Sequence, residues 1–361
     1  MAYGPSDAID PREVRRALVV KLRHHGDVLL ASPVFSVLKR AAPQAEIDAL
    51  IYGETRDMLA LHPAISRLFE IDRAWKSQPF AWRAVAEWRL FRALRERRYD
   101  LIIHLSDHSR GAWLARSLGA RCAVAPDYGN KPRWWRRSFT HWFPQAGRRH
   151  TVELNLDALR RIGIQPGADE RALVLVPGEE ARSRAEALLA ENGLAEKSFI
   201  HLHPGSRWQF KCWPPERIAA LMDELDRRGE RLVLTGAPDK RELELIAEIR
   251  RRTRAPFVDL AGQTTLKTLA ALAARARLFI GVDSAPMHIA AAMRTPVVAL
   301  FGPSGEAEWR PWMTRHRVVV SAEHPCRPCG NDGCGGGKVS ECLTNLALEP
   351  VLAAIDALLA P

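Results

Sequence analysis

The sequence has no uncharged apolar run of about 18 residues, which is the length that a helix needs to cross a bilayer. Its first stretch, MAYGPSDAIDPREVRRA, has no apolar core behind its charges and does not fit a secretory signal. Low-complexity tracts and short internal repeats are absent as well. We therefore expect a globular protein that stays in the cytoplasm.

Acidic residues are scarce in the first half of the chain. Residues 1–175 hold 29 Lys and Arg against 19 Asp and Glu, whereas the remainder holds 24 against 23. This asymmetry indicates an anionic partner for the first half: a nucleic acid, an acidic membrane surface or a phosphorylated ligand. A generally arginine-rich proteome would explain the net charge of +11 but not its uneven placement.

Apolar strand-like runs alternate with helical patterns along all 361 residues, a length that favours two domains. Such alternation predicts parallel sheets covered on both faces, an α/β fold. Two series of strands, divided near residues 167–183, predict two Rossmann-like domains. The expected strands are 17–22, 47–52, 67–71, 101–105 and 122–125, then 199–203, 231–235, 257–260, 278–281 and 297–301. The expected parts are 1–175, 176–345 and a C-terminal helical segment, 346–361, that could pack back on the first domain.

Ligands of doubly wound sheets bind beyond the carboxyl ends of strands, so the turns there are informative. After the strand that ends at His203, Gly205 permits close backbone approach, Ser206 offers a hydroxyl and Lys211 a positive charge. These groups suit a diphosphate, although an ordinary loop would look similar. Gly236 follows the next strand, where a nucleoside could pack or where a simple glycine turn could lie.

The stretch LFIGVDSAPMHIAAAM is the most telling turn of the second half. Asp283 and Ser284 follow a strand and can cap the next helix, whose N-terminus attracts an anion. His288 lies one turn into that helix among small residues. A helix cap explains Asp283 but leaves His288 unexplained.

The first half combines arginines with aromatic side chains. From Arg110 to Arg149 nine basic residues and one acid, Asp127, are interleaved with Tyr128, Phe139 and four tryptophans, which suits single-stranded nucleic acid, a phosphorylated sugar or a solvated loop. Upstream, apolar residues recur every three positions from Trp82 to Leu94 between arginines. We expect this stripe to pack on its own sheet, while a basic amphipathic helix could also lie on anionic lipid.

Asp27, in the turn RHHGDVLL, has two interpretations. Its carboxylate could cap the helix that begins there, or it could project from a strand end toward a substrate. Near the other end of the chain, Cys326, Cys329, Cys334 and Cys342 form a late cluster that could be a structural metal site, a redox pair or four free thiols. Cys122 and Cys212 are expected to be packing residues.

Several of these stretches, VVKLRHHGDVLLASPVFSVLK, HPGSRWQFKCWP, TGAPDKRE and GVDSAPMHIAAAMRTPVVALFGPS, resemble the heptosyltransferases of glycosyltransferase family 9, most of all the lipopolysaccharide core heptosyltransferase III branch. The resemblance runs from about residue 17 to 345. It implies a GT-B fold of two Rossmann-like domains facing across a cleft. The first would bind the lipid A–inner core acceptor and the second the donor, ADP-heptose.

The resemblance also implies roles for single residues. Asp27 would be the general base of an inverting heptosyl transfer, with no cofactor required and, since the chain has no Asp-x-Asp, no metal implied. The enzyme would work at the cytoplasmic face of the inner membrane, on its anionic surface. The donor would be bound by Gly205, Ser206, Lys211, Gly236, Asp283, Ser284 and His288. The acceptor would be bound by Lys21, Arg23, His25, Arg110, Arg133 and Arg136.

Three other functions stay open at this stage. A nucleic-acid-binding protein would explain the charge, but we would then expect basic residues in both halves or a known reading module, and the sequence shows neither. An epimerase or a transferase for another sugar nucleotide would keep the fold, because fold does not fix function. An inactive scaffold would not need Asp27, Lys211 and His288.

Overall fold

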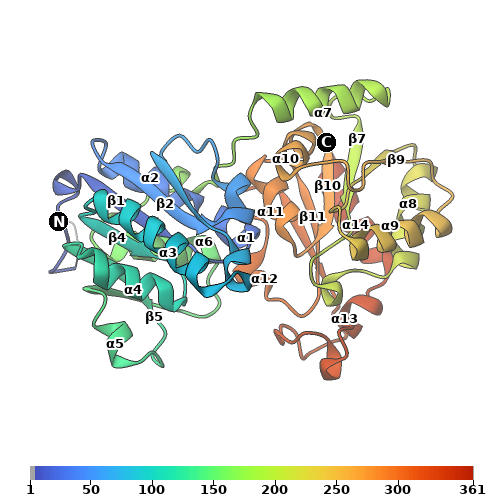
Figure 1. The fold of residues 1–361 in the computed structure, drawn as a ribbon. Coiled ribbons are helices and arrows are strands. Elements are labelled where there is room, and N and C mark those ends of the chain that lie inside the picture. The colour runs from blue at the N-terminus through green and yellow to red at the C-terminus, as the bar shows by residue number, and fades with distance from the viewer. Residues whose placement is uncertain (1–4, 361) are drawn as a thin grey trace. The chain divides into compact units, whose positions relative to one another are not determined.

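The computed structural model describes residues 5–360, so the outermost residues of the predicted domain ranges, 1–4 and 361, lie outside it. The chain divides into two compact units, residues 1–176 and 177–361, and each is described by itself (Figure 1). The sequence analysis placed this boundary after residue 175. No helix within residues 5–360 has the length and apolar character needed to cross a membrane.

The first unit contains a six-stranded parallel sheet in the order β3-β2-β1-β4-β5-β6. The central strands are buried apolar runs, as expected where helices cover both faces of a parallel sheet. The strands are β1 (Arg16–Val20), β2 (Glu46–Tyr52), β3 (Arg67–Ile71), β4 (Leu101–His104), β5 (Cys122–Asp127) and β6 (His141–Pro144). The sequence analysis missed β6.

Helices flank this sheet. They are α1 (His25–Leu29), α2 (Ser32–Ala41), α3 (Phe80–Glu96), α4 (Ser109–Leu118), α5 (Arg133–Arg136) and α6 (Thr151–Arg161). Contacts join α2 to α6, α3 to α4, and α4 to α5. The first unit also contains four short 3-10 turns: η1 (Pro11–Glu13), η2 (Gly53–Met58), η3 (Arg73–Ser77) and η4 (Asp169–Arg171). A further turn, η5 (Gln209–Lys211), lies in the second unit.

The helix α3 packs less than the sequence predicted. Leu94 is its one buried residue, and Phe91 is partly buried against the same core. Trp82, Val85 and Trp88 are exposed, so the expectation that the whole stripe packs on the sheet is wrong for its first three members. A step of three residues turns back by about 60° on a helix with 3.6 residues per turn, so a strict three-residue stripe winds off the buried face.

The second unit repeats the architecture with the order β12-β11-β10-β7-β8-β9. Its strands are β7 (Phe199–His203), β8 (Arg231–Leu234), β9 (Val258–Asp259), β10 (Leu278–Val282), β11 (Val297–Phe301) and β12 (His316–Val320). All are parallel where paired. The sequence analysis missed β12.

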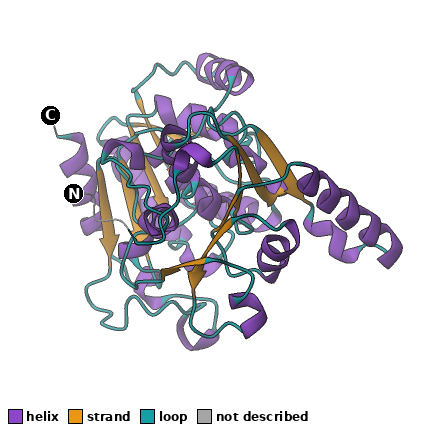
Figure 2. Cartoon of the chain, turned by 90° about the vertical axis from the view of Figure 1, so that its left-hand side faces the viewer, coloured by secondary structure: helices purple, strands orange, loops and turns teal. Residues whose placement is uncertain are grey.

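The helices of this unit cover both faces of its sheet, since the neighbouring β7 residues Phe199 and Ile200 pack in two different cores. Figure 2 colours the helices of the whole chain purple and its strands orange. They are α7 (Glu179–Glu191), α8 (Pro215–Arg227), α9 (Lys240–Arg252), α10 (Leu266–Arg275), α11 (Ala285–Ala292), α12 (Glu306–Trp309), α13 (Glu341–Thr344) and α14 (Leu348–Leu359), with a 3-10 turn, η6 (Cys334–Gly336). Contacts join α8 to α9 and α14, and α10 to α7 and α11.

The C-terminal helix α14 belongs to the second unit. Val351, Ile355 and Leu358 lie in the core that also contains Trp213 and Val319, and α14 contacts β12, β11 and α8. The suggestion that this helix packs back on the first domain is therefore corrected, because its apolar face is used within the second unit.

Both sheets share one topology. Numbered within its own unit, each has the strand order 3-2-1-4-5-6, which is that of the Rossmann fold. The chain changes direction across the sheet between β1 and β4 in the first unit and between β7 and β10 in the second. The carboxyl ends of these strand pairs are where such sheets bind ligands.

Candidate active site

Asp27 lies just beyond the carboxyl end of β1. The helix α1 begins after His24, which occupies the N-cap position, so Asp27 is the third residue of the helix. The alternative that Asp27 caps this helix is therefore wrong. Its carboxylate is 16% exposed, with Oδ1 3.7 Å from Nε of Arg23. A carboxylate at a strand end, partly exposed and beside a guanidinium, is placed to accept a proton.

Lys21 directly follows β1 and precedes Asp27 in the same turn. Its Nζ donates hydrogen bonds to the Leu105 carbonyl at 2.9 Å and to Oδ1 of Asn155 at 3.1 Å, and the residue is 5% exposed. Burial lowers the pKa of Lys21 to about 8, although the charge of Asp27 acts in the opposite direction. Lys21 thus joins the ends of β1 and β4 to α6, which differs from the exposed position expected of an acceptor ligand.

Three further residues lie close by, of which only Tyr128 was noted from the sequence, as one of several aromatic residues after Arg110. Nη1 of Arg23 is 3.5 Å from Oδ1 of Asp107, and Nζ of Lys131 donates to the Asp107 carbonyl at 3.0 Å. Burial, followed by the charge of Asp107, raises the pKa of Tyr128 to about 12. These residues follow β4 and β5, as Asp27 follows β1. Position after a buried strand was the signal that could have found them.

The other predicted acceptor residues are more scattered. His25 lies in the same turn as Asp27, with Nε2 2.8 Å from the Glu54 carbonyl. Arg110 pairs with Glu87 of α3. Arg136 pairs with Asp127 at 2.9 Å, and Arg133 is exposed at the start of α5.

In the second unit the structure brings together residues from two turns that are far apart in sequence. Nζ of Lys211 lies 2.6 Å from Oδ2 of Asp283, and Asp283 is buried. Lys211 follows β7 and Asp283 follows β10, which are neighbouring strands at the point where the strand order reverses. Ser206 is buried beside them, and its Oγ accepts a hydrogen bond from the Trp208 N–H at 3.3 Å.

The N-terminus of α11 carries no side-chain cap. Ser284 is the N-cap residue, but its side chain makes no capping hydrogen bond, and its buried Oγ has no hydrogen-bond partner among residues 5–360. The prediction that Asp283 and Ser284 cap this helix is therefore wrong in detail. His288 is buried within the helix, with its ring centroid 6.4 Å from that of Trp309. The backbone N–H groups at an uncapped helix start and a nearby hydroxyl are groups that can bind an anion.

A buried polar network that was not predicted from the sequence underlies Gly205 and Gly236. Oγ1 of Thr235 lies 2.8 Å from Nε2 of His201 and 2.9 Å from Nδ1 of His203. Oε2 of Glu242 accepts from the Ala237 N–H at 2.8 Å and lies 3.5 Å from Nε2 of His203.

Glu242 shapes both glycine turns. Burial raises the pKa of Glu242, but the hydrogen bonds from His203 and Ala237 outweigh burial and hold it below its usual value. A Cβ added at Gly205 would lie 3.0 Å from Cγ of Glu242 and closer still to its carboxylate. Only glycine fits there without moving Glu242.

The cysteines remain separate thiols. Cys326, Cys329 and Cys334 are exposed and Cys342 is buried. Within residues 5–360 no three His, Cys, Asp or Glu side chains are grouped so that they could hold a metal ion. The arrangement of this cluster therefore does not fit the structural metal site that its spacing suggested.

Solved structures match nearly the whole length of the chain. A family 9 glycosyl transferase from Veillonella parvula has a TM-score of 0.81 at 24% identity, with 98% of this chain and 99% of that chain covered. The Escherichia coli heptosyltransferase WaaC with ADP-2-deoxy-2-fluoro heptose has a TM-score of 0.71 at 19% identity, covering 95% and 99%. These likenesses establish the fold, which is of the GT-B type with two Rossmann-like domains.

Sequence comparison then gives the family. Residues 87–339 match glycosyltransferase family 9 (heptosyltransferase). The chain is 39% identical over 293 residues to lipopolysaccharide heptosyltransferase 3 of Escherichia coli, covering 81% of this chain and 84% of that protein. The chain belongs to glycosyltransferase family 9 and is a heptosyltransferase of lipopolysaccharide core biosynthesis. This membership replaces the nucleic-acid-binding, epimerase and scaffold alternatives.

Proposed function

We propose that the enzyme transfers L-glycero-D-manno-heptose from ADP-heptose to a heptose of the lipopolysaccharide inner core in one inverting step. The observation that carries this proposal is the Lys211–Asp283 pair beside the uncapped N-terminus of α11. It places a cation and unused donors together at the ligand-binding end of the second sheet. The named relatives support the choice of sugar and acceptor.

The donor diphosphate would be bound by three kinds of group. Lys211 supplies an ammonium, the start of α11 supplies backbone N–H groups, and Ser284 supplies a hydroxyl without another partner. Gly205 and Gly236 would let the nucleotide approach the backbone above the Glu242 network, and His288 would stand within the first turn of α11. As the bond to the diphosphate breaks, negative charge grows on its oxygens, and these donors stabilise it most at that moment.

Asp27 would act as the general base. Its carboxylate takes the proton of the acceptor hydroxyl while the hydroxyl oxygen attacks the anomeric carbon and the bond to ADP breaks. The acceptor oxygen itself attacks the donor in this step, so no side-chain nucleophile is needed. Arg23, 3.7 Å away, would hold the carboxylate of Asp27 in position for this step.

The first unit would hold the acceptor. We propose that Arg23, His25, Arg110, Arg133 and Arg136 bind phosphorylated inner-core sugars of lipid A, with Asp107, Tyr128 and Lys131 as added candidates near Asp27. Lys21, being buried, would hold the turn in place. The enzyme would work without a metal or other cofactor, as a peripheral protein at the cytoplasmic face of the inner membrane.

The test is incubation of the purified protein with ADP-heptose and a series of truncated inner-core acceptors. We expect the mass of one heptose to be added to a heptose-bearing acceptor and NMR to show an inverted anomeric configuration. Absence of transfer to every heptose-bearing acceptor would refute the proposal. A product that retains the donor configuration would refute the one-step mechanism.

The Asp27→Asn variant tests the base. Asn keeps the shape and hydrogen-bonding ability but cannot take the proton, so we expect kcat to fall by about 10²–10⁴-fold. The melting temperature and the affinity for ADP should stay close to those of the wild type, which separates chemistry from folding and donor binding. Activity within about threefold of the wild type would exclude Asp27 as the base, because general-base catalysis is worth far more than that.

A further inference from the structure

The outer face of α3 carries large apolar side chains that the fold leaves in solvent. Phe80 is 77% exposed, Trp82 51%, Val85 47% and Trp88 57%. Tryptophan is highly buried in most folded proteins, so two exposed tryptophans about 1.7 turns apart on one helix indicate a surface that another phase or molecule covers.

Arginines share this face with the aromatic side chains. Arg89, Arg92 and Arg95 are exposed on the side of α3 that also carries Val85 and Trp88. The guanidinium of Arg92 lies 5.6 Å from the Trp88 ring centroid and pairs with Glu96 at 2.8 Å. In all, α3 holds four arginines against two glutamates. We call Trp82, Val85, Trp88, Arg89, Arg92 and Arg95 the α3 face.

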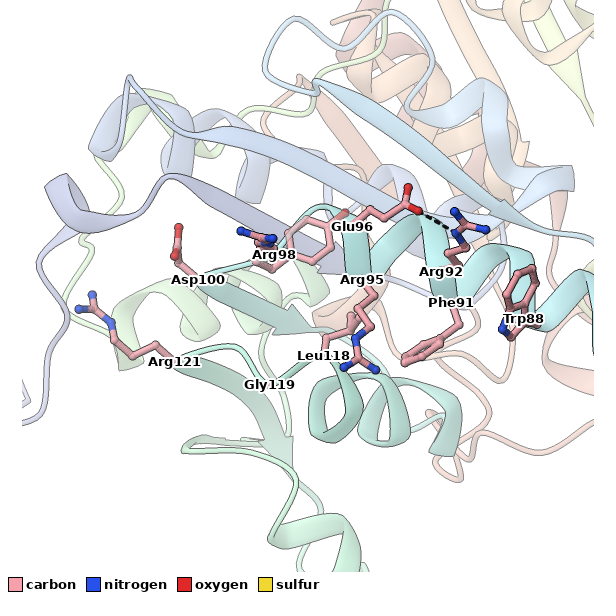
Figure 3. Close-up of a pocket in the computed structure, with 11 residues that line it drawn as sticks. Trp88, Phe91, Arg92, Arg95, Glu96, Arg98, Asp100, Leu118, Gly119 and Arg121 are labelled. Carbon is pink, nitrogen blue, oxygen red and sulfur yellow. Dashed lines mark hydrogen bonds and ion pairs between the residues drawn. The ribbon is translucent and has the colours of Figure 1, made fainter.

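A basic groove adjoins the α3 face (Figure 3). It encloses about 740 Å³ between α3 and the end of α4. Trp88 and Phe91 line it together with four arginines, Arg92, Arg95, Arg98 and Arg121, against two acidic residues, Glu96 and Asp100, so its lining carries an excess of positive charge. Such a groove can take phosphate groups through guanidinium hydrogen bonds.

A second groove, of about 590 Å³, lies toward the start of α4. Its lining is largely aromatic and aliphatic and includes Leu90, Phe91, Trp113 and Trp134. Trp113 and Trp134 are themselves about half exposed, and the ring centroid of Trp113 is 5.1 Å from that of Phe91. The exposed aromatic surface thus continues from α3 onto α4 and α5.

We propose that the α3 face and its basic groove dock on an anionic phospholipid bilayer. Trp82, Val85 and Trp88 would enter the interfacial layer, where tryptophan is favoured, and the arginines would meet lipid phosphates. A second copy of the chain fits this face less well, because two such cationic faces would repel each other. The proposal rests on the proposed function only in its purpose, which is to bring the enzyme to a lipid-anchored acceptor.

The test is sedimentation of the full chain with two kinds of sucrose-loaded vesicle. One kind contains phosphatidylcholine alone, and the other also contains about 30% phosphatidylglycerol, which gives the membrane a negative surface potential that attracts basic segments. We expect binding to the anionic vesicles only, weakened by salt. Trp82→Ser/Val85→Ser/Trp88→Ser and Arg89→Gln/Arg92→Gln/Arg95→Gln should each lower the partition coefficient at least about tenfold. The matched control, Leu243→Ser/Val339→Ser, removes exposed apolar side chains of the second unit and should bind as the wild type does.

Three results would overturn the proposal: equal binding of wild type and both triple variants, equal binding to neutral vesicles, or a dimer in sedimentation velocity that the Ser variant dissociates. Activity on a deacylated, water-soluble acceptor separates this proposal from the proposed function. The two triple variants should keep wild-type activity on the soluble acceptor and should lose activity on the vesicle-bound acceptor. A wild type that binds vesicles yet transfers no heptose to either acceptor would refute the proposed function and leave the docking surface standing.

Discussion

At the scale of single residues, Gly205 shows how a missing methyl group shapes a site. Alanine there would press on Glu242, which is fixed by His203 and the Ala237 N–H. We expect Gly205→Ala to cost about 1–3 kcal/mol of stability, as overpacking does, and to weaken ADP binding, measured by thermal unfolding and calorimetry. Gly147→Ala is the control, because a Cβ added at Gly147 would have no described atom within 4 Å apart from its chain neighbours. Equal melting temperatures for both variants and the wild type would contradict this account of the turn.

Lys21 makes a prediction about pH at the same scale. Its folded pKa of about 8 lies below the ordinary value of 10.5 because of burial. Between these values the unfolded chain holds a proton that the folded chain has released, so this residue makes stability rise with pH; below pH 8 both states are protonated and its contribution is constant. The full gain is about 3 kcal/mol.

The measurement is the unfolding free energy of the wild type and Lys21→Met from pH 7 to pH 10. Both variants share all other titrating groups, so their difference isolates Lys21. We expect the wild type to gain stability relative to the variant above pH 8. A difference that stays flat across this range would mean that Lys21 keeps its ordinary pKa in the folded state.

At the scale of elements, the N-termini of α10 and α11 differ in side-chain capping. Thr265 caps α10 by accepting from the Thr268 N–H at 3.1 Å, whereas Ser284 makes no such bond at α11. Thr265→Ala should therefore cost about 1 kcal/mol of stability and leave ADP binding unchanged.

Ser284→Ala should do the reverse. It removes no hydrogen bond from the protein alone, so the melting temperature should hold. If Ser284 donates to the diphosphate, the Kd for ADP should rise by about 5–10-fold, the worth of one such bond. Calorimetry and thermal unfolding of both variants measure this, and an unchanged Kd for Ser284→Ala would remove Ser284 from the donor site.

At the scale of the whole molecule, the two sheets have separate cores. The second unit includes its own C-terminal helix, and the Trp213 indole N–H donates to the Leu346 carbonyl at 3.1 Å within it. We expect residues 177–361 to fold alone and to bind ADP with a Kd within about tenfold of that of the full chain, a cost below about 1.4 kcal/mol. Circular dichroism checks folding and calorimetry checks binding; a folded unit that does not bind ADP would place donor contacts elsewhere.

Much of this architecture could be predicted from the sequence. Strands β7 and β11 begin and end where the apolar runs do, because buried parallel strands are continuous apolar segments. The bounds of β3 were also predicted, although it is an edge strand with one buried residue. The missed strands, β6 and β12, are sheet edges. They carry His141, Pro144, His316 and Arg317, since an edge strand needs less apolar surface.

The candidate site was predictable to a similar degree. Asp27, Lys211 and Asp283 were found because they follow strands, and the rule that ligands bind at carboxyl ends gives such positions meaning. Glu242 was missed because it lies within the polar pattern of α9, KRELELIAEIRRR, which looks solvent-exposed from the sequence. Only the packing of α9 under Gly205 and Gly236 buries its carboxylate.

The sequence by itself determined the alternation of strands and helices, the glycine turns and the concentration of positive charge in the first half. These are local properties, set by periodicity and residue type. The tertiary structure decided that Lys211 meets Asp283 across 72 positions, that Asp27 lies inside α1 rather than at its cap, and that Trp82 and Trp88 face solvent. These contacts and exposures depend on the order of the strands in the sheet and on the rotation of each helix about its axis. Neither can be predicted from the residues next to a single position in the sequence.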